Sequence, residues 1–218
     1  MNWQHRINRS FKPRFAIIYP FGLLFLFMGV MTDTSLRAGI GFIILGLLIR
    51  LWSNGYAIKN DKLTTSGPYA FVRNPLYVGT FLLALGFVIV LNMGIWGVLF
   101  LIALGFIYRN TISDEQGSLK IKFGQAYIDY CTKVPAMWPT LTPYSDGEKW
   151  PFSLDRLYVS KEHKPVVWII VLLIFFHFKT RVWIFGKSMN PKTWALIWLA
   201  VILIAADIFY EINRKSTK

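Results

Sequence analysis

Long runs of apolar residues alternate with short polar and basic stretches along the whole 218-residue chain. The apolar runs cover residues 15–31, 36–58 and 76–108, and two further runs, 166–178 and 194–210, lie near the end. Runs of this kind are typical of membrane-spanning helices, which need about 20 mostly apolar residues. The pattern therefore predicts an all-α, polytopic integral membrane protein with about five or six membrane-inserted helices.

The third apolar run is predicted to form a tight helical hairpin. Asn92 and Gly94 interrupt the run, and this residue pair favours a turn. Each arm is then roughly 15–17 residues long, near the lower limit for a span. After the second arm, Ser113 has the spacing of a helix N-cap, with Gln116 three residues later. A separate amphipathic helix is therefore predicted to begin near Ser113.

Two parts of the topology stay open at this level. The run at 166–178 is short and is followed by basic residues, so it either crosses the membrane against the positive-inside tendency or is re-entrant or interfacial. Arg50 either extends to the lipid headgroups or faces inward toward an anionic ligand. The N-terminus is predicted to be cytoplasmic because a group of basic residues precedes the first run: His5, Arg6, Arg9, Lys12 and Arg14.

Composition and charge agree with a membrane protein. The chain is 55% hydrophobic and 16% charged, with a mean hydropathy of +0.44, whereas soluble domains have about 25% charged residues. The net charge of +13 comes from basic residues that flank apolar runs, so membrane lipids, not nucleic acid, are the expected partners. Cys131 is the only cysteine, and the three histidines lack metal-ligand spacing, so no metal site is expected.

The stretch from Ser66 to Gly79, directly before the hairpin, carries the candidate chemistry. Taken alone, it is compatible with a turn in which Asn74 caps the next helix and Arg73 binds lipid phosphate. However, polar side chains beside a membrane span suggest function. Because the arms of the hairpin run antiparallel, Arg73, Asn74, Tyr77 and Glu115 are predicted to converge at one interfacial pocket.

Two groups of residues flanking the hairpin resemble the isoprenylcysteine carboxyl methyltransferase family, and the wider group of membrane methyltransferases that includes phospholipid N-methyltransferases. The first group reads Gly-Pro-Tyr, then Arg-x-Pro-x-Tyr-x-Gly, and the second follows the hairpin. The resemblance covers residues 63–135, and the matching positions are Gly67, Pro68, Tyr69, Arg73, Pro75, Tyr77, Gly79, Glu115, Leu119, Phe123, Gly124, Tyr127, Tyr130, Val134 and Pro135. Two positions differ, because Asn74 and Gln116 stand where the family usually has His and Glu.

The resemblance implies S-adenosyl-L-methionine as the methyl donor and cofactor. A guanidinium suits the carboxylate of this molecule, a carboxylate suits its ammonium and ribose hydroxyls, and aromatic faces suit its sulfonium. Arg73 and Glu115 are the expected catalytic residues. Asn74 cannot act as a base near neutral pH. The expected cofactor-binding residues are Gly67, Pro68, Tyr69, Arg73, Asn74, Tyr77, Glu115 and Tyr127.

Together these observations predict a single membrane domain over residues 1–218, with a cofactor-binding core at 63–135 and additional membrane helices at 165–218. The predicted function is methyl transfer to a lipid or other hydrophobic acceptor at the cytoplasmic membrane interface. A phospholipid amine or a thiol is an alternative acceptor. An inactive transporter or assembly factor is the alternative from another class. Aromatic residues of the terminal helices are expected to line the acceptor route: Trp168, Phe175, Phe176, Trp194 and Trp198.

Overall fold

The structure is a computed structural model that describes residues 13–58 and 62–216. The prediction of a cytoplasmic N-terminus depends on basic residues near the start of the chain. The side chains of these residues lie outside the part that the structure describes. Over the described ranges all regular structure is helical, which confirms the all-α prediction. The helices are α2 (Pro13–Met28), α3 (Asp33–Tyr56), η1 (Gly67–Ala70), α4 (Pro75–Val90), α5 (Gly94–Phe123), α6 (Gln125–Lys133), α7 (Leu154–Ser160), α8 (His163–Phe178), η2 (Lys179–Ile184) and α9 (Pro191–Ser216).

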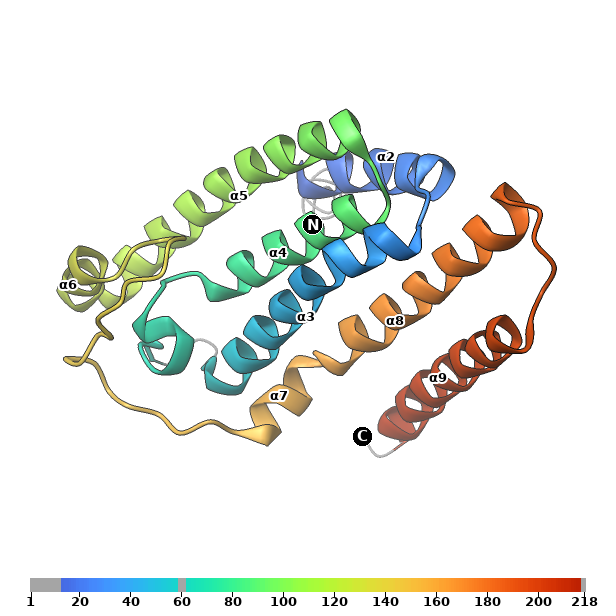
Figure 1. Cartoon of the computed structure of the whole chain (residues 1–218). Coiled ribbons are helices and arrows are strands. Elements are labelled where there is room, and N and C mark those ends of the chain that lie inside the picture. Colours follow the sequence, from blue (N-terminus) through green and yellow to red (C-terminus); the bar gives the residue numbers. More distant parts are fainter. Residues whose placement is uncertain (1–12, 59–61, 217–218) are drawn as a thin grey trace, which may run out of the picture.

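The long helices form one bundle in which α3 and α4 lie between α5 and α8, with α2 beside α5 and α9 beside α8 (Figure 1). Four helices are long and apolar enough to cross a membrane: α3, α5, α8 together with η2, and α9. Two shorter apolar helices complete the bundle, namely α4 and the described part of α2 at Tyr19–Met28. This agrees with the predicted five or six membrane-inserted helices.

Helices α3 and α4 make the most extensive contact in the bundle, and glycines set its distance. A Cβ atom built on Gly46 would lie 2.6 Å from the carbonyl oxygen of Gly79, and one on Gly39 would lie 2.7 Å from that of Gly86. On each helix the two glycines are seven residues apart, about two turns, so they share one face. The two backbones therefore touch along this face, as small residues allow in membrane helices.

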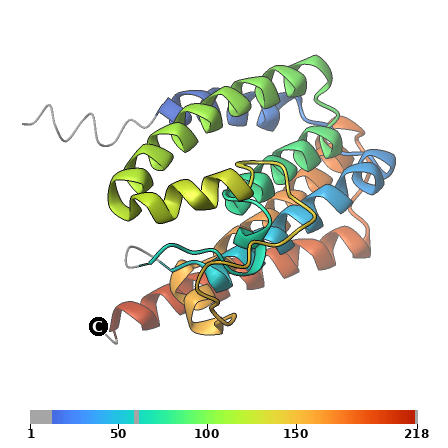
Figure 2. The same cartoon turned by 90° about the vertical axis from the view of Figure 1, so that its left-hand side faces the viewer.

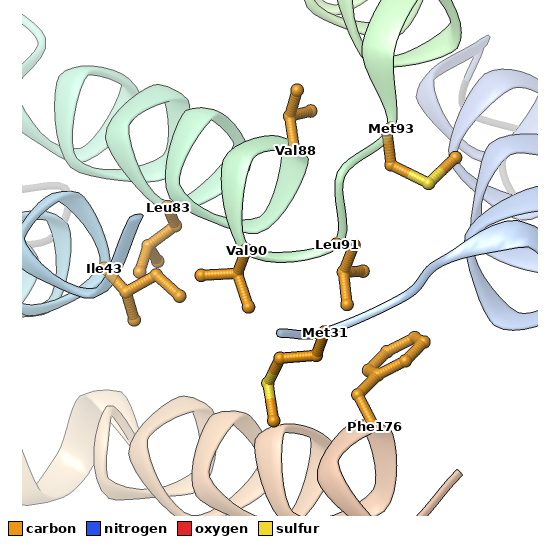
Figure 3. Packing of buried hydrophobic residues seen from close by; sticks show 8 residues of the cluster. All are labelled: Met31, Ile43, Leu83, Val88, Val90, Leu91, Met93 and Phe176. Atoms are coloured by element: carbon orange, nitrogen blue, oxygen red, sulfur yellow. The ribbon is translucent and has the colours of Figure 1, made fainter. Parts of the chain in front are cut away.

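A hydrophobic cluster continues this contact to α8 (Figure 3). Ile43 of α3, Val90 of α4 and Phe176 of α8 are almost fully buried, and Leu83 and Met31 pack with them. Each pair of well-packed apolar atoms contributes only about 0.1–0.2 kcal/mol of dispersion energy, but a buried side chain makes many such contacts, and this packing holds helices together in lipid. This cluster therefore fixes α8 against the α3–α4 pair.

At the same end of the bundle, α8 continues without a break into the π-helical turn η2, so the helix extends from His163 to Ile184. This length supports a crossing over the re-entrant alternative. Lys179 is buried there, and its Nζ donates to the carbonyl oxygens of Phe27 at 2.8 Å and Gly29 at 2.9 Å. These carbonyls lie at the C-terminal end of α2, where helix carbonyls lack partners and a cation is favourable.

The hairpin turn is confirmed, but the predicted helix start at Ser113 is wrong. Asn92 and Gly94 both adopt φ of +50°, and the two arms leave the turn as α4 and α5. Helix α5 then continues through Ser113 to Phe123, because no proline interrupts it and the polar residues around Ser113 extend from an exposed face. It ends at Gly124, which has a φ of +55°.

Arg50 faces inward, and its anionic partner belongs to the protein itself. Its guanidinium donates to both carboxylate oxygens of Glu162, at 2.7 and 3.2 Å, and to Thr80 Oγ1 at 2.6 Å. The inward interpretation is therefore correct, but no external ligand is needed to balance the charge. The contact joins α3, α4 and the start of α8.

Gly46→Ala is expected to destabilise the protein by about 1–3 kcal/mol, because the new methyl group would overlap the backbone of α4. Thermal unfolding in detergent, followed by tryptophan fluorescence, measures the effect. Gly41→Ala is the matched control on α3, since a Cβ atom there has nothing within 4 Å. Equal unfolding temperatures for the two variants would contradict the close approach of α3 and α4.

Candidate active site

Short elements collect at the end of the bundle where α3 ends and α4 begins (Figure 2). We call it the site end. The 3₁₀ helix η1 lies there, and it starts at Gly67 with a φ of +59°, a conformation that glycine adopts most easily. Tyr130 of α6 donates its hydroxyl to the carbonyl oxygen of Tyr69 at 2.6 Å. Gly67 and the buried Pro68 thus shape a turn that α6 holds in place.

The backbone before α4 is bonded to the backbone after α6. The amide of Arg73 donates to the carbonyl oxygen of Pro135 at 2.9 Å, and the amide of Asn74 donates to that of Ala136 at 3.2 Å. The side-chain Nδ2 of Asn74 also donates to Ala136, at 3.0 Å. This junction, which we call the 73–136 junction, brings the two predicted motif groups together. It also gives Asn74 a structural role at a position where the family usually has His.

Arg73 is held by side chains of α6. Its Nη1 donates to Cys131 Sγ at 2.7 Å, and the guanidinium is near enough to Tyr127 to act against the rise of that phenol's pKa. Its Nε is buried without a partner, and no carboxylate among the described residues forms an ion pair with it. Arg73 is half-buried, and a buried donor such as its Nε is costly without a partner. Arg73 therefore has donor capacity and charge left for an anionic ligand.

Arg73 lines a cavity of about 210 Å³, which we call the Arg73 cavity. Tyr69, Asn74 and Tyr127 also line it, as do Leu119 and Phe123 of α5. A second cavity of about 650 Å³ adjoins it, and the two share Lys62, Leu63 and Phe123 as lining residues. The arrangement offers one guanidinium, one amide and several aromatic rings around the Arg73 cavity, with a second cavity beside it.

Tyr77 and Glu115 form a separate pair next to this cavity. The hydroxyl of Tyr77 donates to Glu115 Oε1 at 2.8 Å, and the Tyr77 ring packs edge-on against Tyr108 with centroids 4.9 Å apart. Neither Tyr77 nor Glu115 lines the Arg73 cavity. The Glu115 carboxylate is still close enough to help burial raise the pKa of Tyr69. The prediction that Arg73, Asn74, Tyr77 and Glu115 share one pocket is therefore wrong in part. Arg73 and Asn74 line the Arg73 cavity together with Tyr69 and Tyr127, whereas Tyr77 and Glu115 form a pair outside its lining.

Two larger cavities lie along the membrane helices. The first, the bilayer cavity, has a volume of about 800 Å³ and an almost wholly apolar wall formed by α2, α4, α5 and α8. Of the aromatic residues expected from the terminal helices, only Phe176 lines it. Trp194 and Trp198 of α9 are more than half exposed, because α9 packs along the outer side of α8. The predicted aromatic wall is therefore wrong for α9.

The second, the hairpin groove, has a volume of about 680 Å³ and lies between the two arms of the hairpin. It is lined by residues of α4 between 78 and 85, by residues of α5 between 105 and 116, and by residues 136–139. Tyr108 lines both the groove and the bilayer cavity. The groove and the Arg73 cavity both border the 73–136 junction, since Ala136 lines the groove and Asn74 lines that cavity.

Tyr130 and Cys131 also contact residues of the site, although neither was predicted to be a site residue. They lie three and four residues after Tyr127 on α6, and this spacing places residues on the same side of a helix. The spacing was visible in the sequence. The contact between Cys131 and Arg73, 58 positions apart, depends on how α6 folds back against the start of α4.

Comparison with known proteins shows the family to which the chain belongs. The model of the phospholipid methyltransferase family matches residues 18–126, which is half of the chain and includes the hairpin, Arg73 and Glu115. The chain belongs to this family. It is an integral membrane protein with an all-α fold, and no solved structure matches it at a significant level.

The chain is similar to two kinds of curated protein, namely isoprenylcysteine O-methyltransferases and a metal-resistance protein. The protein-S-isoprenylcysteine O-methyltransferase of Schizosaccharomyces pombe is 34% identical over 116 residues, which are 48% of this chain and 49% of that protein. The human protein of the same name is 34% identical over 89 residues, 38% of this chain and 31% of that protein. The cobalt-zinc-cadmium resistance protein CzcN of Cupriavidus metallidurans is 35% identical over 104 residues, 46% and 47% of the two chains. The chain thus spans about half the length, or less, of these relatives.

The tyrosines of the site are expected to lower stability in strong base. Burial, then the neighbouring Cys131, raises the pKa of Tyr127 from 10.0 to about 12, although Arg73 opposes the shift. Since the folded state disfavours the ionised phenol, its contribution to stability is complete below pH 10 and is lost as pH rises toward 12. Tyr127→Phe should therefore lose less stability than the wild type between pH 10 and pH 12. Chemical denaturation at each pH measures this, and identical pH profiles would contradict it.

Proposed function

We propose that the protein catalyses S-adenosyl-L-methionine-dependent methyl transfer to a hydrophobic acceptor at the membrane interface. The observation that carries the proposal is Arg73. In a chain of the phospholipid methyltransferase family, this arginine lines a cavity with an unpartnered Nε and without a carboxylate partner among the described residues. An α-amino acid carboxylate is the type of anion that a guanidinium binds best, because both groups are planar and pair through two hydrogen bonds.

The residues around the cavity suit the remaining parts of the donor. The rings of Tyr69 and Tyr127 offer faces for a positively charged sulfonium. Glu115, oriented by the Tyr77 hydroxyl, offers a carboxylate for the ammonium group or the ribose. The adjoining cavity provides space beyond the 210 Å³ next to Arg73. When bound, S-adenosyl-L-methionine supplies a methyl group activated by the positive sulfur, which leaves as a neutral thioether.

The site has few groups that could remove a proton from the acceptor. Asn74 does not titrate, and burial keeps Tyr69, Tyr127 and Tyr130 protonated well above neutral pH. A carboxylate acceptor needs no such group, because it is already an anionic nucleophile at neutral pH. We therefore favour O-methylation of a carboxylate. The names of the protein-S-isoprenylcysteine O-methyltransferases state O-methylation for those relatives. The protein would then act mainly by aligning donor and acceptor and by excluding water.

A lipid amine is the second candidate acceptor. The family model bears the name phospholipid methyltransferase, and Glu115 is an exposed carboxylate that could accept a proton from an amine. For either acceptor, the apolar portion is proposed to occupy the bilayer cavity, whose lining residue Tyr108 contacts Tyr77 and so connects it to the Tyr77–Glu115 pair.

Arg73→Ala is expected to weaken binding of S-adenosylhomocysteine by about tenfold to a hundredfold, the loss that follows from removing hydrogen bonds to a charged group. Isothermal titration of the purified full-length protein measures the affinity. Lys120→Ala is the control, since Lys120 is an exposed cation of α5 that lines none of the described cavities. Unchanged affinity in a folded Arg73→Ala protein would refute the assignment of Arg73 to the carboxylate.

Glu115→Gln is expected to lower donor affinity or methyl transfer about tenfold, whereas Asp114→Asn should have little effect. The two acids are neighbours on α5, but only Glu115 is bonded to Tyr77. Methyl transfer from radiolabelled donor to a lipid extract, measured beside donor affinity, separates the two steps. Equal losses in both variants would mean that the acids act only through their general negative charge.

A further inference from the structure

The hairpin groove changes character along its length. Toward the turn of the hairpin its wall is apolar, with Phe81, Leu82 and Leu85 on α4 and Gly105 on α5. Four residues after Gly105, one helical turn closer to the site end, Arg109 lines the same groove, and the polar Ser113 follows a further turn on. A ligand that fills this groove therefore needs an apolar chain at one end and a polar head at the other.

Arg109 gives the polar end its charge. No carboxylate of the described residues forms an ion pair with Arg109, and its side chain is exposed. The bilayer cavity differs in this respect, because none of its lining residues is charged. Charge complementarity thus favours an anionic head in the hairpin groove.

Residues 136–139 cover the polar end of the groove, and they indicate how deep the groove lies in the membrane. Trp138 of this segment is 83% exposed, and Leu141 just beyond it is 98% exposed. Irregular backbone does not lie in contact with the hydrocarbon core, whereas tryptophan favours the headgroup layer. Residues 136–141 therefore lie at the headgroup level, and the apolar part of the groove, on α4 and α5, lies deeper.

We propose that the hairpin groove is a binding site for an anionic phospholipid, with an acyl chain along α4 and α5 and the phosphate at Arg109. This site is separate from the Arg73 cavity and does not depend on the proposed methyl transfer. A lipid bound there would pack against residues 136–139, the segment whose Ala136 accepts hydrogen bonds from Asn74. It would thereby support the 73–136 junction from the side opposite the donor.

The test measures lipid retention without any methyl donor, so its outcome is independent of the proposed function. The full-length protein is reconstituted in nanodiscs of equal parts phosphatidylglycerol and phosphatidylcholine, released, and examined by native mass spectrometry. We expect phosphatidylglycerol to be retained preferentially. Arg109→Gln should reduce this preference about fivefold, the effect of one basic residue near an anionic membrane surface. Lys120→Gln is the matched control on α5 and should leave the preference unchanged.

A second variant tests the apolar end. Gly105→Phe should abolish retention of the lipid, because a Cβ atom at Gly105 has nothing within 4 Å and the new ring can fill the groove without disturbing the helix. Gly41→Phe is the control, since Gly41 of α3 has equal room and lies outside the groove. Equal retention of both lipids by the wild type would overturn the proposal. So would an unchanged preference in Arg109→Gln, or full retention in Gly105→Phe.

Discussion

The close approach of α3 and α4 is the constraint on which the rest of the structure depends. Without side chains at Gly39, Gly46, Gly79 and Gly86, the two backbones come into direct contact. This contact fixes the start of α4, and therefore Arg73 and Asn74, relative to the bundle. It also brings Arg50 of α3 within reach of Thr80. Dispersion between closely packed helices replaces the hydrophobic driving force that is weak between helices in lipid.

The site end is held together by hydrogen bonds, not by the packing of helices. Here irregular segments pass one another, and backbone hydrogen bonds at the 73–136 junction hold them in position. Irregular backbone of this kind needs partners for its polar groups, and α6 and the segment after it provide them. The same bonds orient Arg73 toward its cavity and occupy Asn74. Asn74, which holds the backbone in place, and Arg73, which is proposed to bind the ligand, are thus adjacent residues.

Three of the four cavities differ in chemistry, and each suits a different proposed role. The Arg73 cavity has a cation, an amide and aromatic rings, which suit a compact charged donor. The bilayer cavity has almost no polar wall and suits an alkyl or isoprenoid chain. The hairpin groove combines an apolar floor with Arg109 and suits a lipid with an anionic head. Tyr108 borders the latter two, so changes at this residue would affect both.

The sequence by itself determined the helical membrane fold, the hairpin turn at Asn92 and Gly94, and the two motif groups that meet at the site. These features depend on local composition and on spacing along the chain, which the sequence contains directly. The tertiary structure decided that α5 continues through Ser113, because a capping pattern competes with helix propagation and packing determines which prevails. It also decided that Arg50 binds Glu162, that Cys131 holds Arg73, and that α9 lies outside the bilayer cavity. These contacts join residues far apart in the chain, and only the packing of the helices selects such partners.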